Sequence, residues 1–194
     1  MLKRLCVFCG SSFGVRPEYA EAARAVGRLL AERNVELVYG GSNAGTMHEL
    51  ANACMGAGGR VIGIMPRHMV DREIAHRGIT ELHIVNSMHE RKAMMADLAS
   101  AFLALPGGFG TFEEFFEVLT WSQLGLHRKA CGVLNVAGYY DPLLALADHG
   151  VAEGFVRPVH RELILSGTEP AELLDHLGTY VPPVVEKWLD RSSR

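Results

Sequence analysis

Residues 105–117, with the sequence LPGGFGTFEEFFE, place a glycine-rich turn between a short apolar run and an amphipathic helical pattern. Gly107, Gly108 and Gly110 permit positive φ angles and a close approach of the backbone to a ligand. We expect the following helix to begin at Thr111, so that its free N–H groups and the positive end of its dipole face the turn. These features favour an anion, and the pattern predicts a bound phosphate.

The same turn has an ordinary structural interpretation. Thr111 and Glu114 have the T-x-x-E spacing of a capping box, in which the threonine caps the helix and the glutamate reaches back to it. Glycines are also common in turns that bind nothing. The turn alone therefore leaves a phosphate site and a plain helix cap as alternatives.

Two further strand-to-helix turns contain small residues. Residues 40–46, GGSNAGT, form a second glycine-rich turn that includes Gly41. It does not match G-x-G-x-x-G, and no acidic residue follows at the spacing of a dinucleotide site, so recognition of a monophosphate is the hypothesis that stays open. Gly10 and Ser11 follow the first apolar run and can offer N–H and hydroxyl donors, although both residue types are common in any turn.

Two adjacent cations lie in the first turns of another predicted helix. Arg91 and Lys92 follow Ser87, where we expect this helix to open. Cations at this end oppose the helix dipole, which indicates another role for them; the alternative is an unpaired pair on the surface. The polar segment 67–78 is interpreted as a surface loop near the site or, equally, as a solvated connection.

Apolar runs that alternate with helical patterns must position these residues. We expect strands at 5–8, 35–39, 60–65, 82–85, 101–105, 131–135 and 163–165. We expect helices at 18–33, 46–55, 87–99, from 111 onward, at 142–149 and at 170–177. This order predicts an α/β, doubly wound, Rossmann-like parallel sheet with helices on both faces, as a single domain over 1–180 with a C-terminal tail over 181–194. Both glycine-rich turns would lie at the carboxyl edge of the sheet, where such folds bind ligands.

The composition fits one domain that binds a small molecule. The chain has 194 residues, of which 48% are hydrophobic and 21% charged, and this is enough for one sizeable core. The net charge of -3 and the lack of a basic stretch argue against nucleic acid or an anionic membrane as a partner. Since no signal peptide or run of membrane-spanning length occurs, we expect a cytoplasmic protein.

The four cysteines and nine histidines do not form a metal-binding pattern. Cys6 and Cys9 make the single C-x-x-C, but residues three apart in a strand face opposite sides, so we expect buried packing rather than a redox pair or half a zinc site. No histidine belongs to H-E-x-x-H or a similar cluster, and we expect no metal.

Three segments together resemble one known family. The turn at 105–117 is accompanied by MHERK at 88–92 and LTWSQLG at 119–125. They resemble the Lonely Guy (LOG) family, whose motif is PGGxGTxxE, and the resemblance extends from CVFCGSS at 6–12 to about Phe155. LOG proteins are cytokinin riboside 5'-monophosphate phosphoribohydrolases. The resemblance implies a hydrolase that cleaves the N-glycosidic bond of these nucleotides and of AMP to free base and ribose 5-phosphate, with no cofactor.

The resemblance also implies site residues, by matching position. Arg91 and Glu114 take the catalytic places. Substrate contacts are implied for Gly10, Ser11, Gly41, Glu73, Met88, Lys92, Gly107, Gly108, Phe109, Gly110, Thr111 and Thr120. Ser42 and His48 stand where the family commonly has glycine. The family is dimeric, with sites beside the subunit interface, so a homodimer is expected; the apolar residues spread around the helix after Thr111 suit this.

The residue types suit the implied chemistry. Breaking a ribosyl C–N bond develops positive charge on the sugar, which the carboxylate of Glu114 can stabilise while it activates water. The departing base develops negative charge, which Arg91 can stabilise, although arginine is too weak an acid to donate a proton.

Two other functions are compatible with the pattern. A lysine decarboxylase would need a lysine that holds pyridoxal phosphate, but Lys92 adjoins Arg91, and Lys3, Lys129 and Lys187 lie away from the predicted active edge. A non-catalytic carrier of a nucleotide or pterin-type cofactor would use the same glycine turns. Such a carrier has no need of the two catalytic residues.

Overall fold

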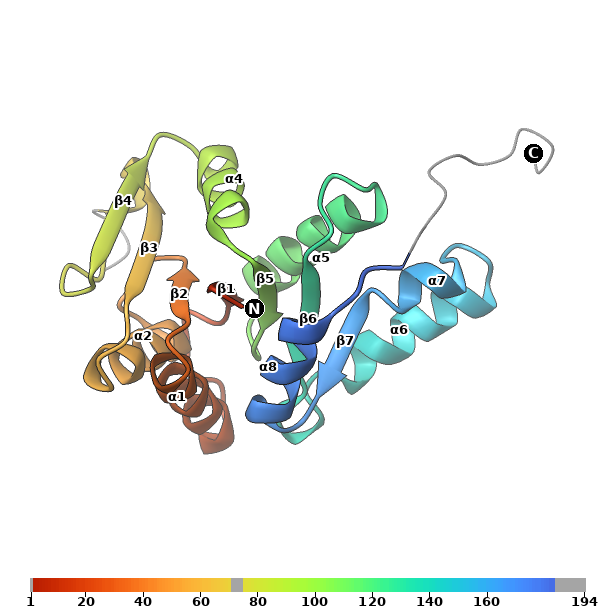
Figure 1. The fold of residues 1–194 in the computed structure, drawn as a ribbon, viewed down its shortest axis with the longest axis horizontal. Helices are drawn as coiled ribbons and strands as arrows, with labels where there is room; N and C mark the ends of the chain where they lie inside the picture. Colours follow the sequence, from red (N-terminus) through yellow and green to blue (C-terminus); the bar gives the residue numbers. More distant parts are fainter. Residues whose placement is uncertain (1, 71–74, 184–194) are drawn as a thin grey trace.

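The computed structural model describes residues 2–70 and 75–183. In this part of the chain, seven strands form one parallel sheet in the order β4-β3-β2-β1-β5-β6-β7 (Figure 1). The strands are β1 (Arg4–Phe8), β2 (Glu36–Tyr39), β3 (Val61–Pro66), β4 (Glu81–Val85), β5 (Ala101–Ala104), β6 (Ala130–Leu134) and β7 (Ile164–Gly167). The apolar runs predict the position of every one of them.

Helices cover both faces of this sheet, which confirms the predicted doubly wound α/β fold. One face carries α1 (Pro17–Glu32), α2 (Gly45–Gly56) and α8 (Pro170–Thr179), and the other carries α4 (Met88–Leu98), α5 (Phe109–Gln123) and α6 (Asp141–Ala152) (Figure 1). The short segments α3 (Arg67–Val70), η1 (Val136–Gly138) and α7 (Pro158–Arg161) were not predicted, because so few residues show no helical periodicity. No helix within the described ranges is long and apolar enough to span a membrane. Most of the tail expected at 181–194 lies outside those ranges.

The central strand β1 is buried because its side chains alternate between two hydrophobic clusters. Leu5 and Val7 pack with the α1, α2 and α8 face, whereas Cys6 and Phe8 pack with the α4, α5 and α6 face. Cys9 belongs to the first cluster, so the two cysteines of the C-x-x-C face opposite sides. Burial raises the pKa of the Cys6 and Cys9 thiols, as expected for packing residues.

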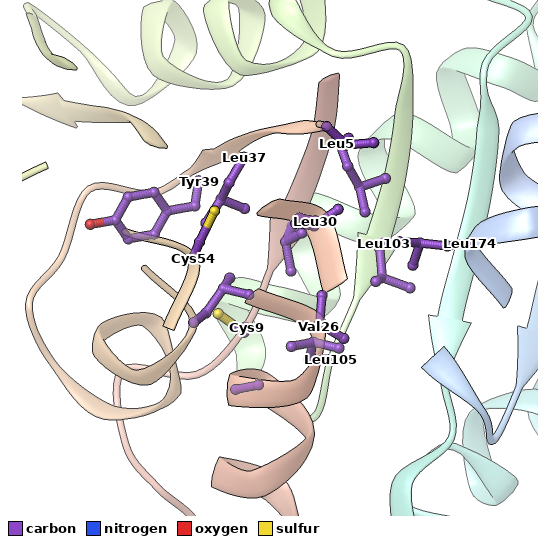
Figure 2. Packing of buried hydrophobic residues seen from close by; sticks show 14 of the residues in the cluster. Leu5, Cys9, Val26, Leu30, Leu37, Tyr39, Cys54, Leu103, Leu105 and Leu174 are labelled. Atoms are coloured by element: carbon purple, nitrogen blue, oxygen red, sulfur yellow. The ribbon is translucent and has the colours of Figure 1, made fainter. Parts of the chain in front are cut away.

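Figure 2 shows how the first cluster joins the sheet to its helices. Leu37 and Leu103, from the strands on either side of β1, lie in the same cluster as Val26 and Leu30 of α1 and Leu174 of α8. All five side chains are almost completely buried. This packing makes the strand ends a rigid base for the loops that follow them.

The order in which the chain adds strands to the sheet reverses between β1 and β5. Strands β2 to β4 extend the sheet on one side of β1, and β5 to β7 extend it on the other (Figure 1). Phe8 and Ala104 are register partners, and the Leu105 N–H donates to the Phe8 carbonyl at 2.9 Å. The loops after β1 and β5 therefore leave the sheet side by side, at the switch point where open parallel sheets bind ligands.

Candidate active site

The glycine-rich turn after β5 leads into α5, which begins two residues earlier than expected. Gly108 is the N-cap residue and α5 starts at Phe109, so Thr111 is the third helical residue. No side chain caps this helix, and Glu114 lies in its second turn, beyond the N3 position that a capping box requires. The capping-box interpretation is therefore wrong. The first-turn N–H groups have no partner within the helix and can serve a ligand.

The three glycines of this turn do not provide positive φ angles, but one of them allows a close approach of two loops. None of Gly107, Gly108 and Gly110 has a positive φ, so this part of the expectation is wrong. A Cβ on Gly107 would lie 2.1 Å from Oγ1 of Thr111 and 3.0 Å from the Gly10 nitrogen, so Gly107 lets the loops after β1 and β5 touch. A Cβ on Gly108 or Gly110 would meet nothing within 4 Å. These two positions present open backbone.

The space around the second glycine-rich turn, after β2, is occupied by other parts of the protein. A Cβ on Gly45 would lie 2.3 Å from backbone atoms of the Ser11 loop. The Met47 N–H, in the first turn of α2, donates to the Gly10 carbonyl at 3.3 Å, and the Thr46 hydroxyl donates to the same oxygen at 3.0 Å. This turn supports the loop after β1, and part of its donor capacity is already used.

The segment after β3 packs on the second turn. Gly41 has a φ of 78°, and its carbonyl accepts the N–H of His76 at 2.9 Å. Ser42 and Ala75 form an isolated antiparallel bridge, and Nε2 of the buried His76 lies 3.0 Å from Oδ1 of Asn52 in α2. The described end of this polar segment is thus part of the wall of the second turn, and not merely a solvated connection.

Arg91 of α4 is held near the carboxyl ends of two strands. Its Nε donates to the Ile64 carbonyl and its Nη2 to the Gly40 carbonyl, both at 3.1 Å. The side chain is 9% exposed. Two hydrogen bonds to fixed backbone oxygens hold the guanidinium in one orientation. Arg91 is therefore a buried, positioned cation rather than the unpaired surface group of the alternative.

The cap expected on α5 occurs instead on α4. The Ser87 hydroxyl accepts the N–H of Glu90, and the Glu90 carboxylate accepts the N–H of Asn86 at 2.8 Å. This reciprocal arrangement closely resembles a capping box. It fixes the start of α4 at Met88, whose Sδ lies 3.8 Å from Nη1 of Arg91.

Glu114 of α5 faces Arg91 in the buried interior of the site. Its Oε1 lies 3.6 Å from Nη1 of Arg91, and its side chain is 12% exposed. Burial raises the pKa of Glu114 from 4.5 to about 7, although the charge of Arg91 opposes this shift. A carboxyl group with such a pKa exchanges its proton near neutral pH, as a general acid or base must.

Lys92 joins α4 to α5. Its ammonium group forms ion pairs with Glu113 and Glu117, the latter at 2.9 Å, and 12% of its side chain is exposed. Burial lowers the pKa of Lys92, but the hydrogen bonds to the two carboxylates outweigh burial and raise the pKa overall. Lys92 therefore balances the acidic residues on either side of Glu114.

Not every predicted site residue joins this cluster. Phe109 and Ser11 are exposed, at the start of α5 and in the loop after β1. Thr120 is also exposed, and it lies six residues beyond Glu114, roughly 9 Å along the helix. Its hydroxyl donates to a carbonyl of its own helix at 2.7 Å. Glu73 lies outside the described residues.

Sequence reasoning missed two residues of the site. A Cβ on Gly40 would lie 2.1 Å from Nη2 of Arg91, so this glycine makes room for the guanidinium. Tyr139, just after η1, donates a hydrogen bond from its hydroxyl to the Gly107 carbonyl. The place of Gly40 at the end of a strand was an available signal. Tyr139 is 32 residues from Gly107 and had no local signal.

The described residues thus combine two elements of a catalytic site. A buried acid and cation lie close together, and an open glycine turn offers backbone donors beside them. Within residues 2–70 and 75–183, no three His, Cys, Asp or Glu side chains form a group able to hold a metal ion. The arrangement can bind an anion and perform acid–base chemistry next to it.

Known proteins resemble this chain over almost its full length. A family model described as "Possible lysine decarboxylase" matches residues 47–177. Probable cytokinin riboside 5'-monophosphate phosphoribohydrolase LOGL9 of Oryza sativa subsp. japonica is 50% identical over 93% of this chain and 79% of its own length. Cytokinin riboside 5'-monophosphate phosphoribohydrolase LOG7 of Arabidopsis thaliana is 49% identical over 93% of this chain and 83% of its own length.

Solved structures with low sequence identity share the fold. A molybdenum cofactor binding protein from Rippkaea orientalis has a TM-score of 0.70 at 17% identity, covering 92% of this chain and 97% of that one. The molybdenum cofactor carrier protein of Chlamydomonas reinhardtii has a TM-score of 0.68 at 16% identity, with the same coverage. At these identities the likeness establishes the architecture alone.

Lys92 and Lys129 do not match the description of the family model. Lys92 would have to leave both carboxylates of α5 to form a Schiff base. Lys129 donates to the Ala96 carbonyl at 2.6 Å, and its ammonium lies 5.9 Å from the centre of the Phe102 ring. The buried pair of Glu114 and Arg91 suits instead the activity for which the relatives of 50% and 49% identity are named, that of a phosphoribohydrolase. This chain belongs to the LOG family, whose members matched here are named cytokinin riboside 5'-monophosphate phosphoribohydrolases.

Proposed function

We propose that this protein hydrolyses the N-glycosidic bond of adenine-type nucleoside 5'-monophosphates, namely AMP and cytokinin riboside 5'-monophosphates. The products are the free base and ribose 5-phosphate. The observation that carries this proposal is the buried pair of Glu114 and Arg91, 3.6 Å apart, next to the open backbone of Gly108 and Gly110. Family membership supports the substrate class, and the geometry supports the task proposed for each residue.

In this proposal, Glu114 acts on the sugar and on water. As the bond between C1' and the base nitrogen breaks, its electron pair leaves with the base and positive charge develops on the ribose. The Glu114 carboxylate stabilises this charge and accepts a proton from the water molecule whose oxygen bonds to C1'. The departing base takes up one proton from the solvent, and Glu114 then releases to the solvent the proton that it accepted, so the overall reaction consumes one water molecule and no net proton.

In this proposal, Arg91 supplies a fixed positive charge that faces the departing base. Because two backbone carbonyls fix its guanidinium, it can meet developing negative charge on the base without reorganising. Its cation also favours the ionised form of Glu114. The N–H groups at the start of α5 and the backbone of Gly108 bind the 5'-phosphate.

We also propose a homodimer that uses one side of α5. Phe115 and Val118 are buried in the protein's own core, but Phe116 on the same helix and Leu124 at its C-cap are 40% and 51% exposed. A second copy would cover these apolar groups. Thr120 lies on the same helix, so a substrate contact from Thr120 would then come from the partner. Light scattering is expected to give twice the monomer mass, and a monomer that is stable at all concentrations would contradict the interface.

The four cysteines are free and buried, which suits a reducing compartment, and we propose a cytoplasmic location. The experiment that tests the function is incubation of the purified protein with AMP, followed by chromatography of the bases. We expect adenine and ribose 5-phosphate in equal amounts. A carrier of the same fold would return AMP intact.

Adenosine is the matched substrate for this experiment. Binding energy from the phosphate can be used to orient the reacting bond, so its removal is expected to lower kcat as well as raise KM. Equal kcat/KM for AMP and adenosine would contradict a phosphate-dependent hydrolase.

A further inference from the structure

Two consecutive tyrosines reach from the end of β6 to the glycine-rich turn after β5. Tyr139 follows η1 and Tyr140 is the N-cap residue of α6. The Tyr139 hydroxyl donates to the Gly107 carbonyl, and the Tyr140 hydroxyl donates to the Leu105 carbonyl at 2.7 Å. The same turn is thus held by hydrogen bonds at two carbonyls, those of residues two apart in the chain.

The two hydrogen bonds have different consequences because of the residue that follows each carbonyl. In a trans peptide, the carbonyl oxygen and the next amide hydrogen point in opposite directions within one plane. A hydroxyl on the Gly107 carbonyl therefore fixes the direction of the Gly108 N–H. The Leu105 carbonyl precedes Pro106, which has no N–H to direct.

The Tyr139 ring is itself firmly placed. It stacks on Phe112 of α5, with centroids 6.4 Å apart and planes at 26°, and it meets Tyr19 of α1 edge-on at 5.6 Å. The chain reaches this position through Ala137 and Gly138, whose φ angles are 51° and 74°. A non-glycine residue in the left-handed region is uncommon and indicates that the surrounding structure enforces this turn.

We propose that Tyr139 is a positioning residue for the phosphate subsite, which aims the Gly108 N–H at the 5'-phosphate by holding the Gly107 carbonyl. Tyr140 makes an equivalent bond that stabilises the turn without directing a donor. This assignment rests on the proposed function for the identity of the anion. It attaches a ligand-binding task to the residue that follows η1.

The test uses binding rather than turnover, so that it does not depend on catalysis. Calorimetry measures the Kd of AMP, ribose 5-phosphate and adenosine in the Glu114→Gln background, which is expected to bind AMP without turning it over, both alone and with Tyr139→Phe or Tyr140→Phe added. We expect Tyr139→Phe to weaken AMP and ribose 5-phosphate about tenfold and to leave adenosine unchanged, since one hydrogen-bonded donor is no longer aimed. Tyr140→Phe is the matched control: it should lower the melting temperature, because the buried Leu105 carbonyl loses its partner, and leave the ratio of AMP to adenosine affinity unchanged.

Three results would overturn the proposal. They are an unchanged AMP affinity in Tyr139→Phe, an equal loss for AMP and adenosine, and a phosphate-specific loss of the same size in Tyr140→Phe. A Glu114→Gln protein that binds AMP no better than adenosine would also overturn it. If that protein binds AMP through its phosphate and Tyr139→Phe weakens it, but the parent protein releases no adenine, then the proposed hydrolase function fails and the positioning role stands.

Discussion

The two glycine-rich turns look alike in the sequence but differ in what surrounds their glycines. After β5, nothing lies within 4 Å of the place where a Cβ of Gly108 or Gly110 would be. After β2, the corresponding places beside Gly40 and Gly45 are filled, with Nη2 of Arg91 at 2.1 Å and the backbone of the loop after β1 at 2.3 Å. Gly107 of the first turn packs against Thr111, like the glycines of the second turn, but Gly108 and Gly110 serve the opposite purpose and leave the backbone open.

This difference distinguishes glycines that are needed for folding from glycines that are needed for ligand binding. A glycine against its own protein lets two chain segments meet, and a side chain added there is expected to disturb the fold or a positioned neighbour. A glycine beside open space keeps the backbone accessible to a ligand, and a side chain added there should leave the fold intact and weaken binding. Substitution of single glycines by alanine therefore tests the comparison directly.

The largest effect is expected for Gly45→Ala in the second turn. Gly45 has a φ of 55°, and the new Cβ would meet backbone atoms that cannot move aside. We expect the free energy of unfolding to fall by about 3 kcal/mol or more, measured by urea denaturation. Gly56→Ala, at the end of the same helix with nothing within 4 Å, is the control and should unfold like the parent. Equal midpoints for both variants would contradict the packing role.

Gly40→Ala is expected to affect catalysis more than stability. The atom that its Cβ would meet belongs to the flexible end of Arg91, which can swing away and lose its bond to the Gly40 carbonyl. We expect the chain to fold with a stability loss of about 1–2 kcal/mol and the rate of adenine release from AMP to fall about a hundredfold. Parent-like turnover would mean that the position of Arg91 does not matter.

The smallest change is expected for Gly110→Ala in the first turn. Alanine is the better helix former, so stability should stay the same or rise by up to about 1 kcal/mol. The KM for AMP should rise about tenfold because the Cβ enters the space assigned to the phosphate, whereas activity on adenosine should not change. An unchanged KM would remove Gly110 from the phosphate subsite.

The sequence predicts the fold well and the site only in part. Parallel strands buried on both faces appear as continuous apolar runs, and such runs locate all seven strands, including β1 and β5 at the switch point. The family resemblance carried by the motifs around Arg91 and Glu114 also points to the pair that the structure brings to 3.6 Å. Local patterns were sufficient for the strands because the signal lies within a few consecutive residues.

Other features depend on contacts between distant residues or on helix register. The T-x-x-E spacing at Thr111 predicts a cap, but α5 begins at Phe109 and the motif has no capping role. The fit of Gly40 to Arg91 joins residues 51 apart in the chain. No local pattern reveals such a contact. The same is true of the hydrogen bond from the Tyr139 hydroxyl to the Gly107 carbonyl in the glycine-rich turn.

The catalytic role of Glu114 is tested most sharply by the pH dependence of kcat/KM for AMP in the parent protein and in Glu114→Gln. A catalytic carboxylate whose pKa is raised to about 7 should give a rate that increases with pH and levels off above about 7.

The raised pKa also means that ionised Glu114 lowers the free energy of unfolding of the parent protein as pH rises from about 4.5 through 7. In that pH range, the free energy of unfolding of Glu114→Gln should therefore rise relative to that of the parent, by about 3 kcal/mol at most.

We predict that Glu114→Gln folds, still binds AMP, and loses turnover by roughly a hundredfold or more with no pH-dependent rise. A Glu114→Gln protein that releases adenine at close to the parent rate, with the same pH profile, would contradict the central claim that this buried carboxylate performs the chemistry.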